Sequence, residues 1–253
     1  MPVSLAELQS TLDNLLKPGE FRDYCPNGLQ VQGQGTISTL VSGVTASQAL
    51  IDAALEKGAD AILVHHGYFW RGEEPTVTGI RRNRLKALLD NDINLFAYHL
   101  PLDAHPQLGN NAQLGLKLGF TPEADLDPLH KSRVGVWGVV DEPCSGDELV
   151  RRITRQLGRA PLHIPGTAKC IEKIGWCTGS AQNYIELAFE AGVDAYLTGE
   201  VSEQTVHFAR ETGMHFFAAG HHATERYGVQ AVGQYLASEF GIAHEFIDID
   251  NPV

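Results

Sequence analysis

Cysteine pairs with metal-binding spacing are missing from this chain. Four cysteines are present, and no two of them form a C-x-x-C pair: Cys25, Cys144, Cys170 and Cys177. Structural zinc sites and thioredoxin-like redox motifs commonly use that spacing, so neither is expected here. We therefore expect reduced cysteines that pack inside a protein of a reducing compartment.

Positive charge and long apolar segments are also scarce. The chain carries 19 Lys and Arg against 31 Asp and Glu, which gives a formal net charge of −12. Such a field repels phosphates and argues against a general nucleic-acid or membrane-surface binder. It still permits a small anionic substrate held by a metal. No apolar run approaches a membrane span and residues 1–4 open no secretory signal, so a soluble, cytoplasmic protein is expected.

What is present is an alternation of short strands and amphipathic helices. In the first half, helices are predicted over residues 4–17, from 45 to 58, over 81–89 and over 111–118. Strands are predicted over residues 28–31, 39–44, 61–66 and 93–98. Thr45, with Gln48 three residues later, is interpreted as the capping box of the second helix. This alternation predicts an α/β fold.

The chain also repeats itself. When residues 48–63 are aligned with residues 182–197, 134 positions later in the chain, several aligned residues are identical or chemically close. Residues 97–119 align in the same way with residues 219–241, 122 positions later. The preserved spacing favours an internal duplication that produces two similar lobes, each a mainly parallel sheet flanked by helices.

The expected domain boundaries follow from the repeat. Lobe 1 is expected at about residues 1–124 and lobe 2 at about 171–253. Residues 125–170, with several prolines, a strand around 134–140 and a helix around 147–157, are expected to be a short linker segment between the lobes.

Two adjacent histidines, His65 and His66, end an apolar strand directly before Gly67. Neighbouring side chains on a regular strand point to opposite faces, so both can reach one site only where the strand ends. Open α/β sheets place ligands at that end of their strands. On this pair alone, metal ligation and a structural role, in which one imidazole caps or meets water while the other packs, are equally good interpretations.

The repeat adds a histidine and an acid at the end of a strand in each lobe. These are His99 with Asp103, and His221 with Glu225. If such a segment enters a helix, residues i and i+4 share a face, so His221 and Glu225 should point the same way. Pro101 is expected to make the first copy less helical and to leave Asp103 fixed by a turn.

Imidazoles and carboxylates without paired cysteines suit divalent ions such as zinc, manganese, iron or nickel. A bridging carboxylate can hold two such ions about 3.5–4 Å apart. The alternative is that the histidines are structural and lie in separate places. Matched positions at the ends of strands favour the metal site.

Six segments together resemble the YbgI-like members of the Nif-three-like family, whose proteins are often labelled GTP cyclohydrolase 1 type 2 homologues. The segments are Asp23–Val31, Gly43–Ser47, Val64–Trp70, His99–Asp103, Thr198–Val201 and Gly220–Glu225. The resemblance runs almost end to end and is weakest over about 121–170. It implies a two-lobed α/β fold, a toroidal homohexamer and two divalent metal ions per subunit.

Carried over by position, the resemblance makes His65, His66, Asp103, His221 and Glu225 the metal ligands. His99 matches a family position beside the metals that is not usually counted as a ligand. In the repeat, however, it corresponds to the ligand His221, so its role stays open. The large domain that longer family members insert between the lobes is absent from this sequence.

Glu200 lies opposite His66 in the repeat. It is a candidate general base or partner of a ligand, and a simple acid at a helix N-terminus is nearly as good an interpretation. Tyr68, Phe69 and Trp70 follow the histidine pair, where they could line a pocket and stack on a planar base or form a subunit interface.

Two functions from different classes remain open. The first is a metal-dependent hydrolase, of the cyclohydrolase or phosphoesterase type, acting on a small, nucleotide-like molecule. The second is a non-catalytic metal-binding or regulatory hexamer. No glycine-rich phosphate loop of the P-loop kind supports GTP recognition. Arg81, Arg82 and Arg84 could bind phosphate, but a solvated helix face is the better interpretation.

Overall fold

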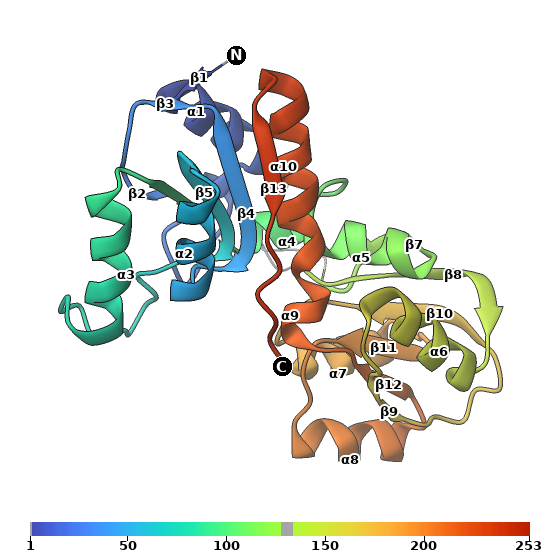
Figure 1. Cartoon of the computed structure of the whole chain (residues 1–253). Helices are drawn as coiled ribbons and strands as arrows, with labels where there is room; N and C mark the ends of the chain where they lie inside the picture. The colour runs from blue at the N-terminus through green and yellow to red at the C-terminus, as the bar shows by residue number, and fades with distance from the viewer. Residues whose placement is uncertain (1, 128–133) are drawn as a thin grey trace. The chain divides into compact units, whose positions relative to one another are not determined.

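The computed structural model describes residues 2–127 and 134–253, and the chain divides into two compact units (Figure 1). Unit 1 comprises Met1–Leu102 and Gly228–Asp250, and unit 2 comprises Asp103–Tyr227 and Asn251–Val253. The chain therefore leaves unit 1, builds unit 2, returns to unit 1 and ends in unit 2. Each unit is a sheet flanked by helices, which confirms the α/β class.

Unit 1 contains a five-stranded sheet that is mainly parallel. Its strands, in spatial order, are β13 (Ala243–Phe246), β4 (Thr39–Thr45), β5 (Ala61–His66), β6 (Asn94–Ala97) and β2 (Gly28–Val31). Only the pairing of β2 with β6 is antiparallel. A separate antiparallel pair joins β1 (Val3–Ser4) to β3 (Thr36–Ile37). The helices of this unit are α1 (Leu5–Leu16), α2 (Gln48–Glu56), α3 (Gly79–Asp90) and most of α10 (Arg226–Phe240).

One face of this sheet is covered by α2 and α3. Leu50 and Leu88 from these helices share a buried cluster with Ile62 and Val64 of β5. Because side chains alternate along a strand, His65 projects from the face opposite to Ile62 and Val64. β5 is the middle strand of the sheet and is buried from Ala61 to His65, which fixes where its terminal histidines lie.

The start of α2 differs from the expected capping box. Ser47, not Thr45, is the N-cap residue, and its hydroxyl accepts a hydrogen bond from the Leu50 amide at 3.2 Å. Thr45 is still part of β4, where it pairs with His66 of β5. A residue held in the sheet cannot also cap the helix, so the helix starts two residues later.

Unit 2 contains a six-stranded mixed sheet. Its spatial order is β7 (Phe120–Asp125), β8 (Val136–Cys144), β10 (Ile171–Trp176), β11 (Ala195–Thr198), β12 (His215–Ala218) and β9 (Leu162–Ile164). Only β10–β11 and β11–β12 pair in parallel. The expectation of a mainly parallel sheet in each lobe is therefore not confirmed for this unit. Its helices are α5 (Asn110–Leu118), α6 (Gly146–Leu157), α7 (Ile185–Glu190), α8 (Glu203–Thr212) and α9 (His221–Thr224), and α4 (Leu100–Ala104) leads into it.

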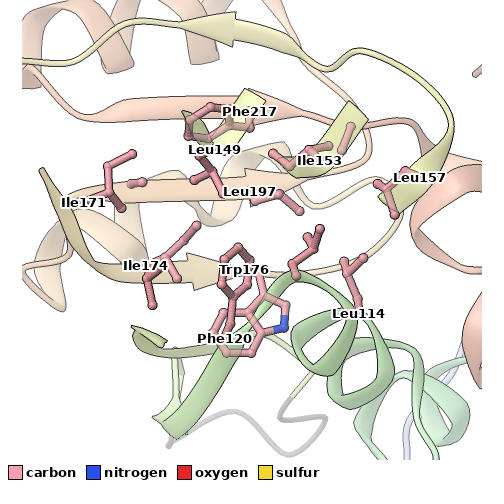
Figure 2. Close-up of a cluster of buried hydrophobic side chains, with 14 of the residues drawn as sticks. Leu114, Phe120, Leu149, Ile153, Leu157, Ile171, Ile174, Trp176, Leu197 and Phe217 are labelled. Atoms are coloured by element: carbon pink, nitrogen blue, oxygen red, sulfur yellow. The ribbon is translucent and has the colours of Figure 1, made fainter. Parts of the chain in front are cut away.

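The core of unit 2 forms around Trp176 (Figure 2). This side chain is fully buried, and its indole Nε1 donates a hydrogen bond to the Asn111 carbonyl at 2.9 Å. Leu149 and Ile153 of α6 and Phe217 of β12 belong to the same cluster. Burial of each such side chain contributes about 2 kcal/mol, so this core holds α5 and α6 firmly on the sheet.

Residues 125–170 were expected to be a linker between lobes, and the described part, 125–127 and 134–170, belongs to unit 2. Residues 128–133 lie outside the described residues. The described part provides β8, which lies between β7 and β10, and the amphipathic helix α6. A complete capping box at Ser145 and Glu148 starts that helix. The units consequently differ in their boundaries from the expected lobes of 1–124 and 171–253.

Candidate metal centre

Three imidazoles meet in unit 1 where β5 and β6 end. The ring centroids are 4.5 Å apart for His65 and His66, 5.0 Å for His65 and His99, and 5.7 Å for His66 and His99. One ring nitrogen of each lies within 4.8 Å of one from each of the others. The side chains of His65 and His66 therefore lie in one cluster, as predicted from their position at the end of a strand.

Neighbouring groups fix the orientation of the first two rings. His65 Nδ1 lies 3.0 Å from the Tyr98 carbonyl oxygen, which can only accept, so the proton sits on Nδ1 and the lone pair on Nε2. His66 Nδ1 lies 3.3 Å from the Thr45 hydroxyl. Histidines that bind metals are typically held through their other nitrogen in this way.

His99 is held by a carboxylate that sequence reasoning did not select. Its Nδ1 donates to Asp23 Oδ1 at 2.7 Å, and its backbone amide donates to Asn27 Oδ1 at 2.7 Å. Burial would raise the pKa of Asp23, but the hydrogen bond and charge of His99, together with bonds from Asn27 and the Tyr24 amide, lower it to about 2. Asp23 is thus ionised and aligns His99.

The lowered pKa predicts how Asp23 affects stability. Because the folded pKa of about 2 lies below the ordinary 3.8, the ionised carboxylate stabilises the fold above about pH 4 and loses this effect as pH falls toward 2. Asp23→Asn should cost about 2 kcal/mol of unfolding free energy at pH 7. Urea titrations between pH 7 and 3 should show the difference from wild type shrinking; a constant difference would contradict the prediction.

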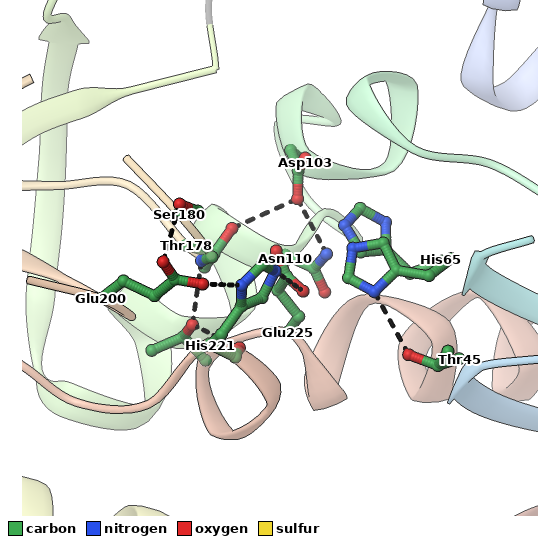
Figure 3. Close-up of polar contacts among 12 residues, drawn as sticks. Thr45, His65, Asp103, Asn110, Thr178, Ser180, Glu200, His221 and Glu225 are labelled. Carbon is green, nitrogen blue, oxygen red and sulfur yellow. Dashed lines mark hydrogen bonds and ion pairs between the residues drawn. The ribbon is translucent and has the colours of Figure 1, made fainter. Parts of the chain in front are cut away.

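Asp103 is oriented by two side chains of unit 2. Its Oδ1 accepts hydrogen bonds from Asn110 Nδ2 at 2.9 Å and from the Thr178 hydroxyl at 3.2 Å (Figure 3). The expected turn at Asp103 is wrong, because the residue lies in the short helix α4. Pro101 sits in the first turn of that helix, where its missing N–H has no helical partner to lose.

His221 and Glu225 meet along α9 as the i, i+4 spacing predicted. His221 Nε2 lies 3.2 Å from Glu225 Oε2, and its Nδ1 lies 2.7 Å from Glu200 Oε1. The Ser180 hydroxyl donates to the other Glu200 oxygen at 3.0 Å (Figure 3). Glu200 is therefore a partner that orients His221, rather than only an acid at a helix N-terminus.

The charges of this second cluster fit a cation. A carboxylate oxygen of Asp103 lies within 4.8 Å of one from Glu225, and both side chains are buried. Two like charges at this separation repel in a low-dielectric interior, and a divalent ion between them removes that cost. The imidazole and carboxylate donors are those that zinc, manganese, iron and nickel accept. The residues present thus fit the expected metal.

The protonation of His221 gives a pH prediction. Burial lowers its pKa, but the hydrogen bonds and charges of Glu225 and then Glu200 outweigh this and raise it to about 9. If a metal binds at Nε2, it would displace the proton there, so apparent affinity should rise up to about tenfold per pH unit below pH 9. Adding Mn²⁺ to weakly buffered protein at pH 7.5 should release a proton that His221→Asn does not release. Affinity independent of pH would contradict this.

The cysteines and the arginines of α3 have surroundings that suit structural roles. All four cysteines are free; three are buried and Cys170 is exposed, so the packing role does not extend to it. Arg82 is exposed on α3, as expected for a solvated helix face, whereas Arg81 and Arg84 are half-buried. Arg81 forms a salt bridge with Glu73 at 2.5 Å.

Asp23, Asn110 and Thr178 hold side chains of the candidate site and were not predicted from the sequence pattern. Asp23 stood in the first segment of the family resemblance, which was the available signal. Asn110 and Thr178 gave none, because their role depends on contacts with Asp103 that form only on folding.

The fold and these two clusters define a class: an α/β protein whose histidines and carboxylates form candidate sites for a divalent metal. The chain belongs to the DUF34/NIF3 family, described as NGG1p interacting factor 3, whose profile matches residues 3–252. Relatives include the GTP cyclohydrolase 1 type 2 homolog of Pseudomonas aeruginosa, 56% identical over 252 residues and covering 100% of both chains. That of Escherichia coli K12 is 52% identical over 247 residues, covering 97% of this chain and 98% of the relative.

Solved structures support the same assignment. A structure described as protein ybgI, of unknown function, is 50% identical with a TM-score of 0.95, covering 99% of this chain and 100% of that one. A protein of Thermus thermophilus is 31% identical with a TM-score of 0.90 and the same coverage. Within the part of the chain that the structure describes, no helix combines the length and apolar character needed to cross a membrane.

Proposed function

We propose that His65, His66, Asp103, His221 and Glu225 together bind two divalent metal ions, and that the protein is a hydrolase of a small molecule. The observation that carries the proposal is the orientation of the donors. His65 and His221 are both held through Nδ1 by an acceptor, and Asp103 is held through Oδ1, so each has its second donor atom defined. Such supporting bonds are typical of metal ligands.

A bound divalent ion would lower the pKa of water and polarise the group under attack. The chain's own residues supply the rest. Glu200 keeps the His221 proton on Nδ1, while Asn110 and Thr178 hold Asp103 against rotation. Glu200 and His99 are our candidates for moving a proton during the reaction. Each takes part in a short carboxylate–imidazole hydrogen bond, Glu200 with His221 and His99 with Asp23.

A substitution of Glu200 tests its contribution to metal affinity. Glu200→Gln keeps the size of the side chain but removes the charge opposite His221 Nδ1. Loss of a residue that supports a metal ligand typically lowers metal affinity about 10–100-fold, and we expect that range. Competition with a fluorescent chelator measures it, with Glu203→Gln, an exposed acid of α8, as the control. Equal metal affinities for both variants and wild type would show that Glu200 does not support metal binding.

The name of the relatives supports a substrate class. Their name, GTP cyclohydrolase 1 type 2 homolog, favours a nucleotide-like substrate, and a phosphoesterase or amide hydrolysis uses the same donor set. The test is a screen of the protein, loaded in turn with Zn²⁺, Mn²⁺, Fe²⁺ and Ni²⁺, against nucleotides, phosphoesters and cyclic amides. Turnover that disappears with Asp103→Ala supports hydrolysis. No turnover, with metal removal lowering only the melting temperature, would defeat it.

The alternative is a non-catalytic metal-binding or regulatory hexamer. The family description as an interacting factor favours this second function. In that case Asp103→Ala should break up the assembly, whereas a catalytic centre should lose activity with the assembly intact. Sedimentation of the variant beside wild type separates the two functions.

We also infer that the two units arose by duplication. The order β4, α2, β5, α3, β6 in unit 1 matches β10, α7, β11, α8, β12 in unit 2, and each series is parallel. Each series is followed by a short helix: α4 contains the proposed ligand Asp103, and the proposed ligand Glu225 directly follows α9.

A further inference from the structure

A loop with three successive aromatic residues follows the histidine pair of unit 1. Tyr68 is buried, and its hydroxyl donates to the Ala46 carbonyl at 2.8 Å. The expectation that all three aromatics could meet a ligand therefore fails for Tyr68, which anchors the loop. Phe69 and Trp70 remain, and 40% of Phe69 is exposed.

Trp70 contacts the imidazole cluster directly. Its ring meets His99 edge to face with centroids 4.9 Å apart, and lies 5.9 Å from His66. The indole Nε1 donates to the Gly67 carbonyl at 3.2 Å, which fixes the ring plane. A second loop brings Tyr24 to the same cluster, with its ring 6.4 Å from His99 and 59% of the residue exposed.

The two loops are tied to one another. The Arg71 amide donates to the Tyr24 carbonyl at 2.7 Å, and its guanidinium donates to the Asp23 carbonyl at 3.1 Å. Tyr24, Phe69 and Trp70 are therefore carried by one braced structure, here called the aromatic platform. Its arginine is engaged with backbone oxygen, so recognition of a ring is favoured over recognition of a phosphate.

Phe69 has a backbone conformation that its side chain disfavours. Its φ is +66°, in the left-handed region where an aromatic residue is an outlier. Such strain persists where the surrounding structure enforces it and is concentrated at ligand sites. Glycine would adopt this φ without strain, yet the chain places a large, exposed aromatic ring there.

We propose that the aromatic platform binds a planar unsaturated ring of the substrate by stacking, beside the histidine cluster. This rests on the proposed function, because it assigns the substrate of that same site to compounds with a nucleobase-like or flavin-like ring. Stacking on aromatic side chains tolerates different bases, since each presents a π-face. The platform selects for a ring and leaves its edge groups to other contacts.

The test compares ligands that share a phosphorylated five-carbon sugar or sugar alcohol and carry different rings or none. Mn²⁺-loaded protein is titrated by calorimetry with the 5′-monophosphates of guanosine, adenosine, cytidine and uridine, with flavin mononucleotide, and with ribose 5-phosphate, which lacks a ring. At least one ring compound should bind tenfold or more tightly than ribose 5-phosphate. Trp70→Leu and Phe69→Gly should each abolish that preference, whereas Phe189→Ala, which removes a similarly exposed aromatic from α7, should retain it.

The accompanying measurements decide between outcomes. Phe69→Gly should keep or raise the melting temperature, because it relieves the positive φ, and should leave metal content and molecular mass unchanged. Equal binding of ring compounds and ribose 5-phosphate by wild type overturns the proposal, as does dissociation of an oligomer in both platform variants, which would make the surface an interface. If wild type binds rings but takes up no metal, the proposed function fails while the platform stands.

Discussion

Asp103→Asn should lower metal affinity at least about 100-fold, equivalent to about 2.7 kcal/mol, while the metal-free protein stays as stable as wild type or becomes more stable. Both effects follow from one charge. The amide retains an oxygen for Asn110 and Thr178 but no longer offers an anionic ligand. It also ends the repulsion with Glu225, whose carboxylate lies within 4.8 Å.

The result is informative because metal affinity should fall while the stability of the metal-free protein should not. Equilibrium dialysis with Zn²⁺ and Mn²⁺ measures affinity, and urea unfolding in chelator measures stability. Glu123→Gln, which removes one exposed carboxylate of the same unit, serves as the control and should change neither quantity. A large loss of stability in the metal-free Asp103→Asn protein would show instead that Asp103 is a structural acid.

Gly179→Ala is the second change with a large expected effect. A Cβ at this position would lie 2.1 Å from Glu225 Oε1 and 3.2 Å from His221 Nε2, and the glycine has a φ of +70°. The methyl group must push the Glu225 carboxylate away from its place. We expect a loss of metal affinity of at least about tenfold, together with about 1–2 kcal/mol of destabilisation from the disfavoured φ.

The chain offers a matched control for Gly179. Gly192 has nearly the same φ, +69°, but a Cβ there would meet nothing within 4 Å. Gly192→Ala should therefore show the backbone cost alone, with metal affinity unchanged. Thermal unfolding and chelator competition on both variants separate the two contributions, and equal affinities would mean that Glu225 is not a ligand or can move without cost.

Local pattern predicted much of the molecule. The helices over Leu5–Leu16 and Asn110–Leu118 and the strand ending at His66 follow from periodicity that each segment carries within itself. The shared face of His221 and Glu225 followed from helical spacing, and the structure shows them 3.2 Å apart. Errors arose at boundaries, where Thr45 belongs to a strand and Asp103 to a helix.

The partners of the predicted ligands could not be obtained in this way. Asp23 contacts His99 across 76 residues of sequence, and Thr178 contacts Asp103 across 75. Such pairs form because separate elements pack together, and spacing along the chain contains no record of it. The same holds for residues 125–170, whose strand and helix gain their place only by sharing a core with unit 2.

The sequence by itself determined the α/β class, the family resemblance and the donor types, because these depend on residue identity and short-range periodicity. Tertiary structure alone decided how each donor is held: which nitrogen of His65 and His221 faces an acceptor, which oxygen of Asp103 is engaged, and that Glu200 contacts His221. Those features depend on distances between atoms far apart in sequence, which only the packed chain fixes.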